Sequence, residues 1–190
     1  MYDFGPVRFA AILPVALFLF VLVLRAQDIS APLRAEFAYV ANEGNNTVSG
    51  YTINPATGAL TAIAGSPFAA GKYPQSVAVD SGGKFAYVVN ADSFNVSGYT
   101  INPATGALMP IPGSPFTVGG NFSLAGVTVD PNGKFVYVTG QGVFGYTIDS
   151  VTGALTAIAG SPFAFPATGI PDSVAVDPSS KTQVPITDVS

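Results

Sequence analysis

The sequence predicts an all-β protein made of repeated four-stranded antiparallel meanders. The chain of 190 residues repeats itself with a period of about 50 residues. Each repeat contains four short apolar runs, separated by clusters of Gly, Pro, Asn and Asp that are typical of turns. The 21 Gly and 16 Pro are too many for long helices, and beyond the N-terminus no apolar stripe has helical spacing.

The N-terminal segment differs in composition from the rest of the chain. Residues 9–24 read FAAILPVALFLFVLVL, follow Arg8 and precede RAQDIS. This apolar run predicts a helix within residues 1–27, which we interpret as an export signal peptide cleaved near Ala26. The alternatives are a retained membrane anchor, although a bilayer-spanning helix needs about 20 apolar residues, and a helix buried in the main domain. The first two interpretations predict a secreted, periplasmic or cell-surface protein, or a membrane-anchored one with the repeats outside; residues 9–24 would be its only membrane contact.

The repeats occupy residues 28–181. Their most regular feature is the pattern FxYV, followed in each unit by GYT and Ile, then TGAL, GSPF, and VAVD or VTVD. The FxYV patterns begin at Phe37, Phe85 and Phe135. We therefore predict three repeats at approximately 37–84, 85–134 and 135–181, and a tail at 182–190 that fits no strand of the repeat.

The gaps between apolar runs have the chemistry of tight turns. The thirteen residues VSGYTINPATGAL occur identically at 48–60 and 96–108, and the turn NPATG lies inside them. There Pro presets φ, Asn can bond its own backbone, and Gly permits a positive φ. The segments DSGGK at 80–84 and DPNGK at 130–134 have the same character. Each unit thus reads as strands FAYVV, VSGYTI, ALTAIAGSPF and SVAVD, joined in that order by hairpins.

Successive side chains of a strand point to opposite faces, and in FAYVV and SVAVD both alternating sets are apolar or small. These strands are therefore expected to be covered on both faces. Copies of one sheet covering each other are the arrangement of β-propeller blades, and we favour it over a β-solenoid, whose coils are shorter. The predicted fold is an incomplete ring of about three blades after an N-terminal apolar helix.

At these residues the sequence resembles the lactonase-type seven-bladed β-propellers, which include 6-phosphogluconolactonase and the YVTN-repeat proteins. The resemblance rests on FAYVVN at 85–90, VSGYTINPATGAL, the GSPF strands, and SVAVDSGGKFAYV at 76–88. It implies a propeller fold and, in complete family members, hydrolysis of a sugar lactone.

Three units form only an open arc, since closed propellers have about 4–8 blades. An uncovered blade face has an area on the order of 350 Å², worth roughly 9 kcal/mol if stripped of its neighbour. We therefore expect the isolated chain either to self-associate through the exposed blade faces or to fold poorly.

Composition excludes several functions. The net charge is −4 and no Lys/Arg cluster is present, which argues against nucleic-acid binding. The chain contains no Cys and no His, so it has no disulfides, no thiolate or imidazole metal ligands and no Ser-His or Cys-His nucleophile. We predict no metal site and no cofactor.

Residues present in every unit are predicted to be structural, because one site does not need three copies. This covers the turn aspartates with their lysines, and the tyrosines of GYT. Better candidates for ligand contacts are polar residues of the unequal loops, where propellers usually bind ligands. These candidates are Glu43, Asp92 and Gln141 after the FxYV strands, and Lys72 and Asp172 before the VAVD strands.

Two functions remain open at this stage. Lactone hydrolysis needs a general base and donors for the developing oxyanion. Beyond the leader the sequence contains one Arg, Arg34, and no catalytic residue of the family transfers to it. We predict an exported binding or structural module of the lactonase-like family, or a truncated family member, without a catalytic site of its own and with an unidentified small-molecule or protein ligand. The alternative is a lactonase-like hydrolase that is active only when the ring is completed.

Overall fold

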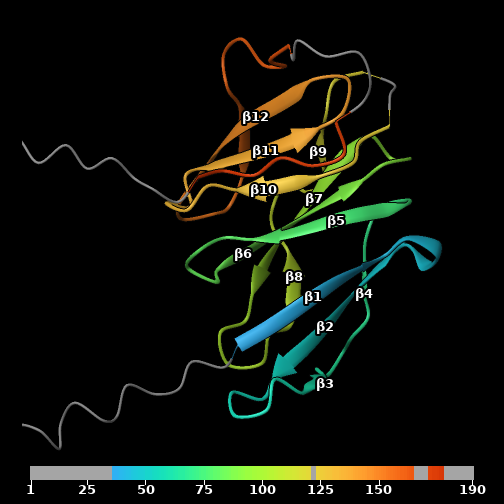
Figure 1. Ribbon diagram of the computed structural model, residues 1–190, viewed down its shortest axis with the longest axis vertical. Coiled ribbons are helices and arrows are strands. Elements are labelled where there is room, and N and C mark those ends of the chain that lie inside the picture. Colours follow the sequence, from blue (N-terminus) through green and yellow to red (C-terminus); the bar gives the residue numbers. More distant parts are fainter. Residues whose placement is uncertain (1–35, 121–122, 165–170, 178–190) are drawn as a thin grey trace, which may run out of the picture. The chain divides into compact units, whose positions relative to one another are not determined.

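The computed structural model describes residues 36–120, 123–164 and 171–177, and these residues form three antiparallel β-sheets (Figure 1). The sheets contain four, five and four strands in chain order, and we call them sheets 1, 2 and 3. The all-β prediction is therefore confirmed, and the sheets are consistent with propeller blades. The predicted N-terminal helix and the tail at 182–190 lie outside the described residues.

Sheet 1 has the order β1-β2-β3, and β4 also pairs with β2. A short 3-10 helix, η2, connects β1 to β2. The bounds are Glu36–Asn42 for β1, Glu43–Asn45 for η2, Thr47–Ile53 for β2, Leu60–Ala62 for β3 and Phe68–Ala69 for β4.

Sheet 2 has the order β5-β6-β7-β8, with β9 also on β7, and sheet 3 has the order β10-β11-β12-β13. The bounds in sheet 2 are Pro74–Val79 for β5, Phe85–Asn90 for β6, Asn95–Ile101 for β7, Leu108–Pro110 for β8 and Phe116–Thr117 for β9. Those in sheet 3 are Val127–Val129 for β10, Phe135–Thr139 for β11, Val143–Ile148 for β12 and Leu155–Ala157 for β13.

The SVAVD strand does not belong to the sheet predicted for it. It was expected to end each meander, yet β5 pairs with β6 of the following unit, with Val77 opposite Val88 and Ala78 opposite Tyr87. The strand therefore begins the next sheet. Sheets 2 and 3 each start one strand earlier in the sequence than the predicted repeat, which starts at FxYV. The physical reason is the DSGGK turn, in which the Asp80 carboxylate accepts from the amides of Lys84 and Phe85 and so folds β5 back onto β6 as a tight hairpin.

The predicted strand ALTAIAGSPF is broken in two, and both pieces lie against the GYT strand. In sheet 1, β3 and β4 both pair with β2. The Ser66 hydroxyl between them accepts a hydrogen bond from the Gly50 amide at 2.9 Å. A Cβ at Gly50 would come within 2.7 Å of the Ile63 side chain, so the strand needs glycine there. Ser114 with Gly98 and Ser161 with Gly145 repeat this contact in the other sheets.

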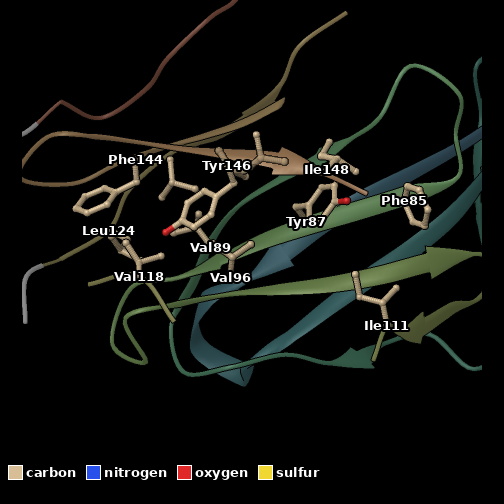
Figure 2. Packing of buried hydrophobic residues seen from close by; sticks show 13 residues of the cluster. Phe85, Tyr87, Val89, Val96, Ile111, Val118, Leu124, Phe144, Tyr146 and Ile148 are labelled. Carbon is tan, nitrogen blue, oxygen red and sulfur yellow. The ribbon is translucent and has the colours of Figure 1, made fainter. Parts of the chain in front are cut away.

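The core consists of two apolar clusters, one on each face of sheet 2. Val88 and Ala86 of β6 belong to the cluster that contains Phe37 and Tyr39 of sheet 1. On the other face, residues of β6 pack against Val136 and Tyr146 of sheet 3. Figure 2 shows this second cluster, with Tyr146 and Ile148 of β12 beside Tyr87 and Val89 of β6. Every residue of β6 is buried, as its apolar phases predicted.

Tyrosine hydroxyls form hydrogen bonds between neighbouring sheets. Tyr39 of sheet 1 donates to the carbonyl of Gly106 at 2.7 Å, and Tyr87 of sheet 2 donates to that of Gly153 at 2.8 Å. Both acceptors are the glycine of a TGAL turn in the following sheet. In the opposite direction Tyr99 donates to the carbonyl of Ala69 at 2.7 Å. Burial raises the pKa of Tyr39 to about 12, so the hydroxyl remains a donor well into alkaline pH.

The repeated aspartates organise turns, as predicted. One carboxylate oxygen of Asp80 accepts from the amides of Lys84 and Phe85, each at 2.6 Å, and Asp130 repeats the arrangement in the next turn. The lysine is not simply a solvated partner of the aspartate, however. The Lys84 ammonium group donates to the Ser150 carbonyl at 2.6 Å and lies 4.8 Å from the centre of the Phe85 ring. It links sheet 2 to a turn of sheet 3.

Candidate functional site

Three loops of unequal sequence meet between sheets 1 and 2. They are residues 43–46 after β1, residues 71–73 before β5 and residues 91–94 after β6, and we call them the loop cluster. Backbone contacts join them: the Ala91 amide donates to the Tyr73 carbonyl, and the Tyr73 amide donates to Asn46 Oδ1, both at 2.9 Å. The Lys72 amide donates to Ser93 Oγ at 2.8 Å. The cluster is thus a connected structure, not a set of separate loops.

Tyr73 is the centre of the polar side chains in the loop cluster. Its hydroxyl is hydrogen-bonded to Glu43, and this bond together with the charge of Glu43 raises the tyrosine pKa. The charge of Asp92 acts in the same direction. Two carboxylates from different loops therefore act on one phenol, and their negative charge disfavours its phenolate form. The Tyr73 side chain is 40% exposed, so part of it remains open to a ligand.

The loop cluster also contains an unusual backbone. Three non-glycine residues of the described chain have a positive φ, and all three are in or beside these loops: Asn46 at 56°, Tyr73 at 58° and Phe94 at 52°. Asn tolerates this conformation, but it is a clear outlier for bulky side chains. Residues held in sparsely populated conformations gather at binding and active sites. The strain therefore supports this cluster as the candidate site.

A buried asparagine at the end of β6 holds the loops by hydrogen bonds. Asn90, at the end of β6, is fully buried and donates to Asn95 Oδ1 and Ser97 Oγ at 2.8 and 2.9 Å. Its own Oδ1 accepts from the Gly71 amide at 3.0 Å. A Cβ at Gly71 would lie 2.6 Å from Asn90 Cγ, so only glycine lets the loop approach this closely. The side chain thereby ties the β5 loop to the β6 loop.

The structure brings together three of the five predicted site residues. Glu43, Lys72 and Asp92 lie in the loop cluster, and the Asp92 amide donates to the Lys72 carbonyl at 3.3 Å. Gln141 is exposed in the loop between β11 and β12. Asp172 lies beside Gly126, where a Cβ would be 2.7 Å from the Asp172 carbonyl oxygen. Among described residues no hydrogen bond joins Gln141 or Asp172 to the loop cluster.

Sequence reasoning missed Tyr73. The signal was present, because the tyrosine lies in an unequal loop between Lys72 and Pro74 and has no counterpart in the other units. A lone aromatic residue in a loop, unlike a charged or amide side chain, does not by itself indicate a polar contact. Its role depends on contacts with Glu43 and Asn46, both distant in sequence, which no local pattern shows.

The loop cluster offers carboxylate acceptors, a phenol and an exposed aromatic face. Such a set can bind hydroxyl or amine groups of a small molecule, with the ring packing on an apolar face of the ligand. Within the described part of the chain no group of three or more Asp, Glu, His or Cys side chains is arranged to hold a metal ion. In the same residues no helix reaches the length and apolarity required to cross a bilayer.

The three antiparallel sheets, of four, five and four strands, follow one another in series with repeated interface contacts and unequal loops, which defines a β-propeller protein. The model of the family "Lactonase, 7-bladed beta-propeller" matches residues 25–120, which is half of the sequence. The chain belongs to this family. Among curated proteins no sequence match was found.

Solved structures agree on the fold. A putative 6-phosphogluconolactonase from Bacteroides uniformis is similar with a TM-score of 0.56 at 18% identity, and the similarity covers 64% of this chain and 36% of that one. The periplasmic gluconolactonase PpgL of Pseudomonas aeruginosa is similar with a TM-score of 0.54 at 18% identity, with the same coverage. This chain therefore spans about a third of the length of these proteins. At such identities the likeness shows the fold alone.

Proposed function

We propose that the chain is an exported β-propeller module that binds a small hydroxyl-rich molecule at the loop cluster and has no catalytic site of its own. One observation carries this proposal: three loops are joined by bonds of the Tyr73 amide to Asn46 Oδ1, of the Ala91 amide to the Tyr73 carbonyl and of the Lys72 amide to Ser93 Oγ. These bonds place Glu43, Tyr73 and Asp92 in one cluster. The repeated aspartates and tyrosines, in contrast, are engaged in turns and sheet contacts. The unequal residues are therefore the ones available to a ligand.

The test of binding is a calorimetric titration of the full chain with a neutral monosaccharide such as glucose. Tyr73→Ala removes the ring and the phenol, and we expect it to weaken binding by about tenfold or more, as for a central aromatic contact. Met109→Ala is the matched control, because Met109 is exposed on β8, outside the loop cluster. If both variants bind with the same affinity as the unaltered chain, the loop cluster is not the binding site.

A lactonase-like hydrolase acting on a sugar lactone is the second candidate. Its support is the family match, together with two similar structures whose names are those of a putative 6-phosphogluconolactonase and a gluconolactonase. In this case Glu43 or Asp92 is the general base, and the ring must first be completed. Acid release from 6-phosphogluconolactone separates the candidates. We expect the uncatalysed rate, whereas turnover that Glu43→Gln abolishes would establish the hydrolase.

Export is part of the proposal. It rests on the apolar sequence of residues 9–24, and the periplasmic location in the name of the Pseudomonas relative is consistent with it. The alternative is an anchor that is retained, with the repeats outside the membrane. N-terminal sequencing of the product from a secreting host distinguishes the two, because a start near residue 27 means cleavage and a start at Met1 means an anchor.

A further inference from the structure

The FxYV strand of sheet 1 is paired on one side only. In sheet 2 the equivalent strand β6 lies between β5 and β7, and in sheet 3 β11 lies between β10 and β12. Within the described residues β1 pairs with β2 and with no other strand. Such an edge presents a row of backbone donors and acceptors that can template another strand.

The sequence that would fill this edge occurs near the other end of the chain. Residues 173–177 read SVAVD, identical to residues 76–80, which include most of β5. Strand β5 pairs with FAYVV of β6, and the same FAYV stands in β1 at residues 37–40. Residues 173–177 nevertheless form no strand in this structure. Within the described residues, the sequence of an inner strand at 173–177 thus has no sheet, and sheet 1 has no inner strand.

The segment already lies where the inner strand of a fourth sheet would begin. Ser76 of β5 touches the next inner strand, since its hydroxyl accepts from the Val127 amide at 3.2 Å. One sheet further on, a Cβ at Gly126 would be 3.0 Å from the Cα of Ser173. Gly126 has the position in its unit that Ser76 has in the preceding unit. The spacing of inner strands is therefore maintained up to Ser173.

The outer face of sheet 1 is apolar and exposed. Val40 is 46% exposed and Leu60 is 53% exposed, whereas their equivalents in sheet 2, Val88 and Leu108, are 0% and 5% exposed. Val88 and Leu108 are covered by sheet 1. The outer face of sheet 1 therefore has the residues that elsewhere dock onto a preceding sheet.

Sheet 3 has the matching outer face. Phe85 and Tyr87 of sheet 2 are buried by the TGAL turn of sheet 3, where Tyr87 bonds Gly153. Their equivalents in sheet 3, Phe135 and Tyr137, are only partly buried. On the other outer face, a Cβ at Gly58 would meet no atom within 4 Å. Each half of an interface used twice inside the chain is thus present and open at one end.

We propose that a second copy of this chain docks head to tail, so that residues 173–176 of one copy add to β1 of the next as its inner strand. The pairing of β5 with β6 sets the register, with Val174 opposite Val40, Ala175 opposite Tyr39 and Val176 opposite Ala38. A second copy is the occupant because it has both halves of the interface, each with residues already used internally. Two copies provide six consecutive blades, within the range of about 4–8 for propellers.

Docking of a second copy in this way does not depend on the proposed ligand or activity. Its test uses the absence of cysteine from the natural sequence. Full-length Ala38→Cys and full-length Val176→Cys are mixed and oxidised. Opposite residues of antiparallel strands have Cα atoms about 4.5–5.5 Å apart, within the range of a disulfide. We expect a covalent dimer that contains one copy of each variant.

The matched control is Ala38→Cys mixed with Ser173→Cys. Ser173 is three residues from Val176, about 10 Å along the strand, and thus out of reach. The first pair should give roughly tenfold more mixed dimer than the control. Equal yields, or no mixed dimer, would overturn the proposed pairing. So would a monomeric cross-link in the double variant of Ala38 and Val176, which would show that the segment folds back within one chain.

A second variant separates strand addition from other association, including any through residues 9–24. Ala175→Pro removes a backbone donor from a segment that forms no strand within its own chain, so the three sheets should fold unchanged. We expect it to abolish the register-specific cross-link, while Ala175→Val retains it. Undiminished cross-linking of the proline variant, with unchanged circular dichroism, would contradict the proposal.

Discussion

Strands β1 and β6 contain the same four residues, FAYV, but their surroundings differ completely. Every residue of β6 is buried, whereas none of β1 is fully buried. The difference comes from neighbours, because among the residues that the structure describes sheet 2 is covered on both faces and sheet 1 on one. Identical sequence therefore contributes unequally to stability, and the middle sheet is expected to hold most of the stabilisation. Matched substitutions in the two sheets can measure this.

The largest effect is expected at the tyrosine of FxYV. Tyr87→Ala removes a fully buried ring and its bond to the Gly153 carbonyl, and should lower the free energy of unfolding by about 3–5 kcal/mol. Tyr39→Ala should cost about half as much, since Tyr39 is only partly buried. Urea unfolding followed by circular dichroism gives both values. Equal losses would show that the two sheets are equivalent in solution.

A smaller effect is expected at the glycine of the TGAL turn. Gly58 and Gly153 have φ values of 72° and 76°, so alanine is strained at both by roughly 1–2 kcal/mol. A Cβ at Gly153 would also lie 2.6 Å from the Phe85 ring, which adds about 1–3 kcal/mol of overpacking. The comparison of Gly153→Ala with Gly58→Ala isolates this packing cost.

The difference in destabilisation between Gly58→Ala and Gly153→Ala also depends on association between copies. When copies dock head to tail, the turn of Gly58 becomes covered, and the cost of Gly58→Ala should approach that of Gly153→Ala as the protein concentration increases. If the loss of stability caused by Gly58→Ala stays constant while dimers form, the contact between copies does not involve the turn of Gly58.

The smallest effect is expected at the tyrosine of GYT. Tyr99→Phe deletes the hydrogen bond to the Ala69 carbonyl and should cost about 1 kcal/mol. Tyr51 is the equivalent residue at the outer face of sheet 1, where the described residues include no sheet before it. At protein concentrations low enough to keep the chain monomeric, Tyr51→Phe should change stability by less than about 0.5 kcal/mol. A cost at Tyr51 equal to that at Tyr99 would show that another chain covers this face.

Much of the fold could be predicted because its signals are local. The Asp80 turn is such a case, since the carboxylate bonds amides two to five residues away. The partner of SVAVD was assigned wrongly for the complementary reason. A short apolar strand looks the same whether it ends one sheet or begins the next, and only the pairing of Val77 with Val88 distinguishes the two.

The candidate site was predictable only in part. The inequality of the loops indicated Glu43, Lys72 and Asp92, because residues that are not repeated need not serve the repeat. Tyr73 was missed because its significance lies in a positive φ and in contacts with Glu43 and Asn46. Both features come from the packing of loops that are distant in sequence.

The sequence by itself determined the strands, the turns and the three-fold repetition, because hydrogen bonds and side-chain alternation within a few residues specify them. The tertiary structure decided the rest: which strand begins a sheet, which copy of FAYV is buried, and which loop residues meet. These properties depend on contacts between residues that are distant along the chain. Burial is a property of neighbours, so two identical segments such as residues 48–60 and 96–108 have the same conformation but different surroundings.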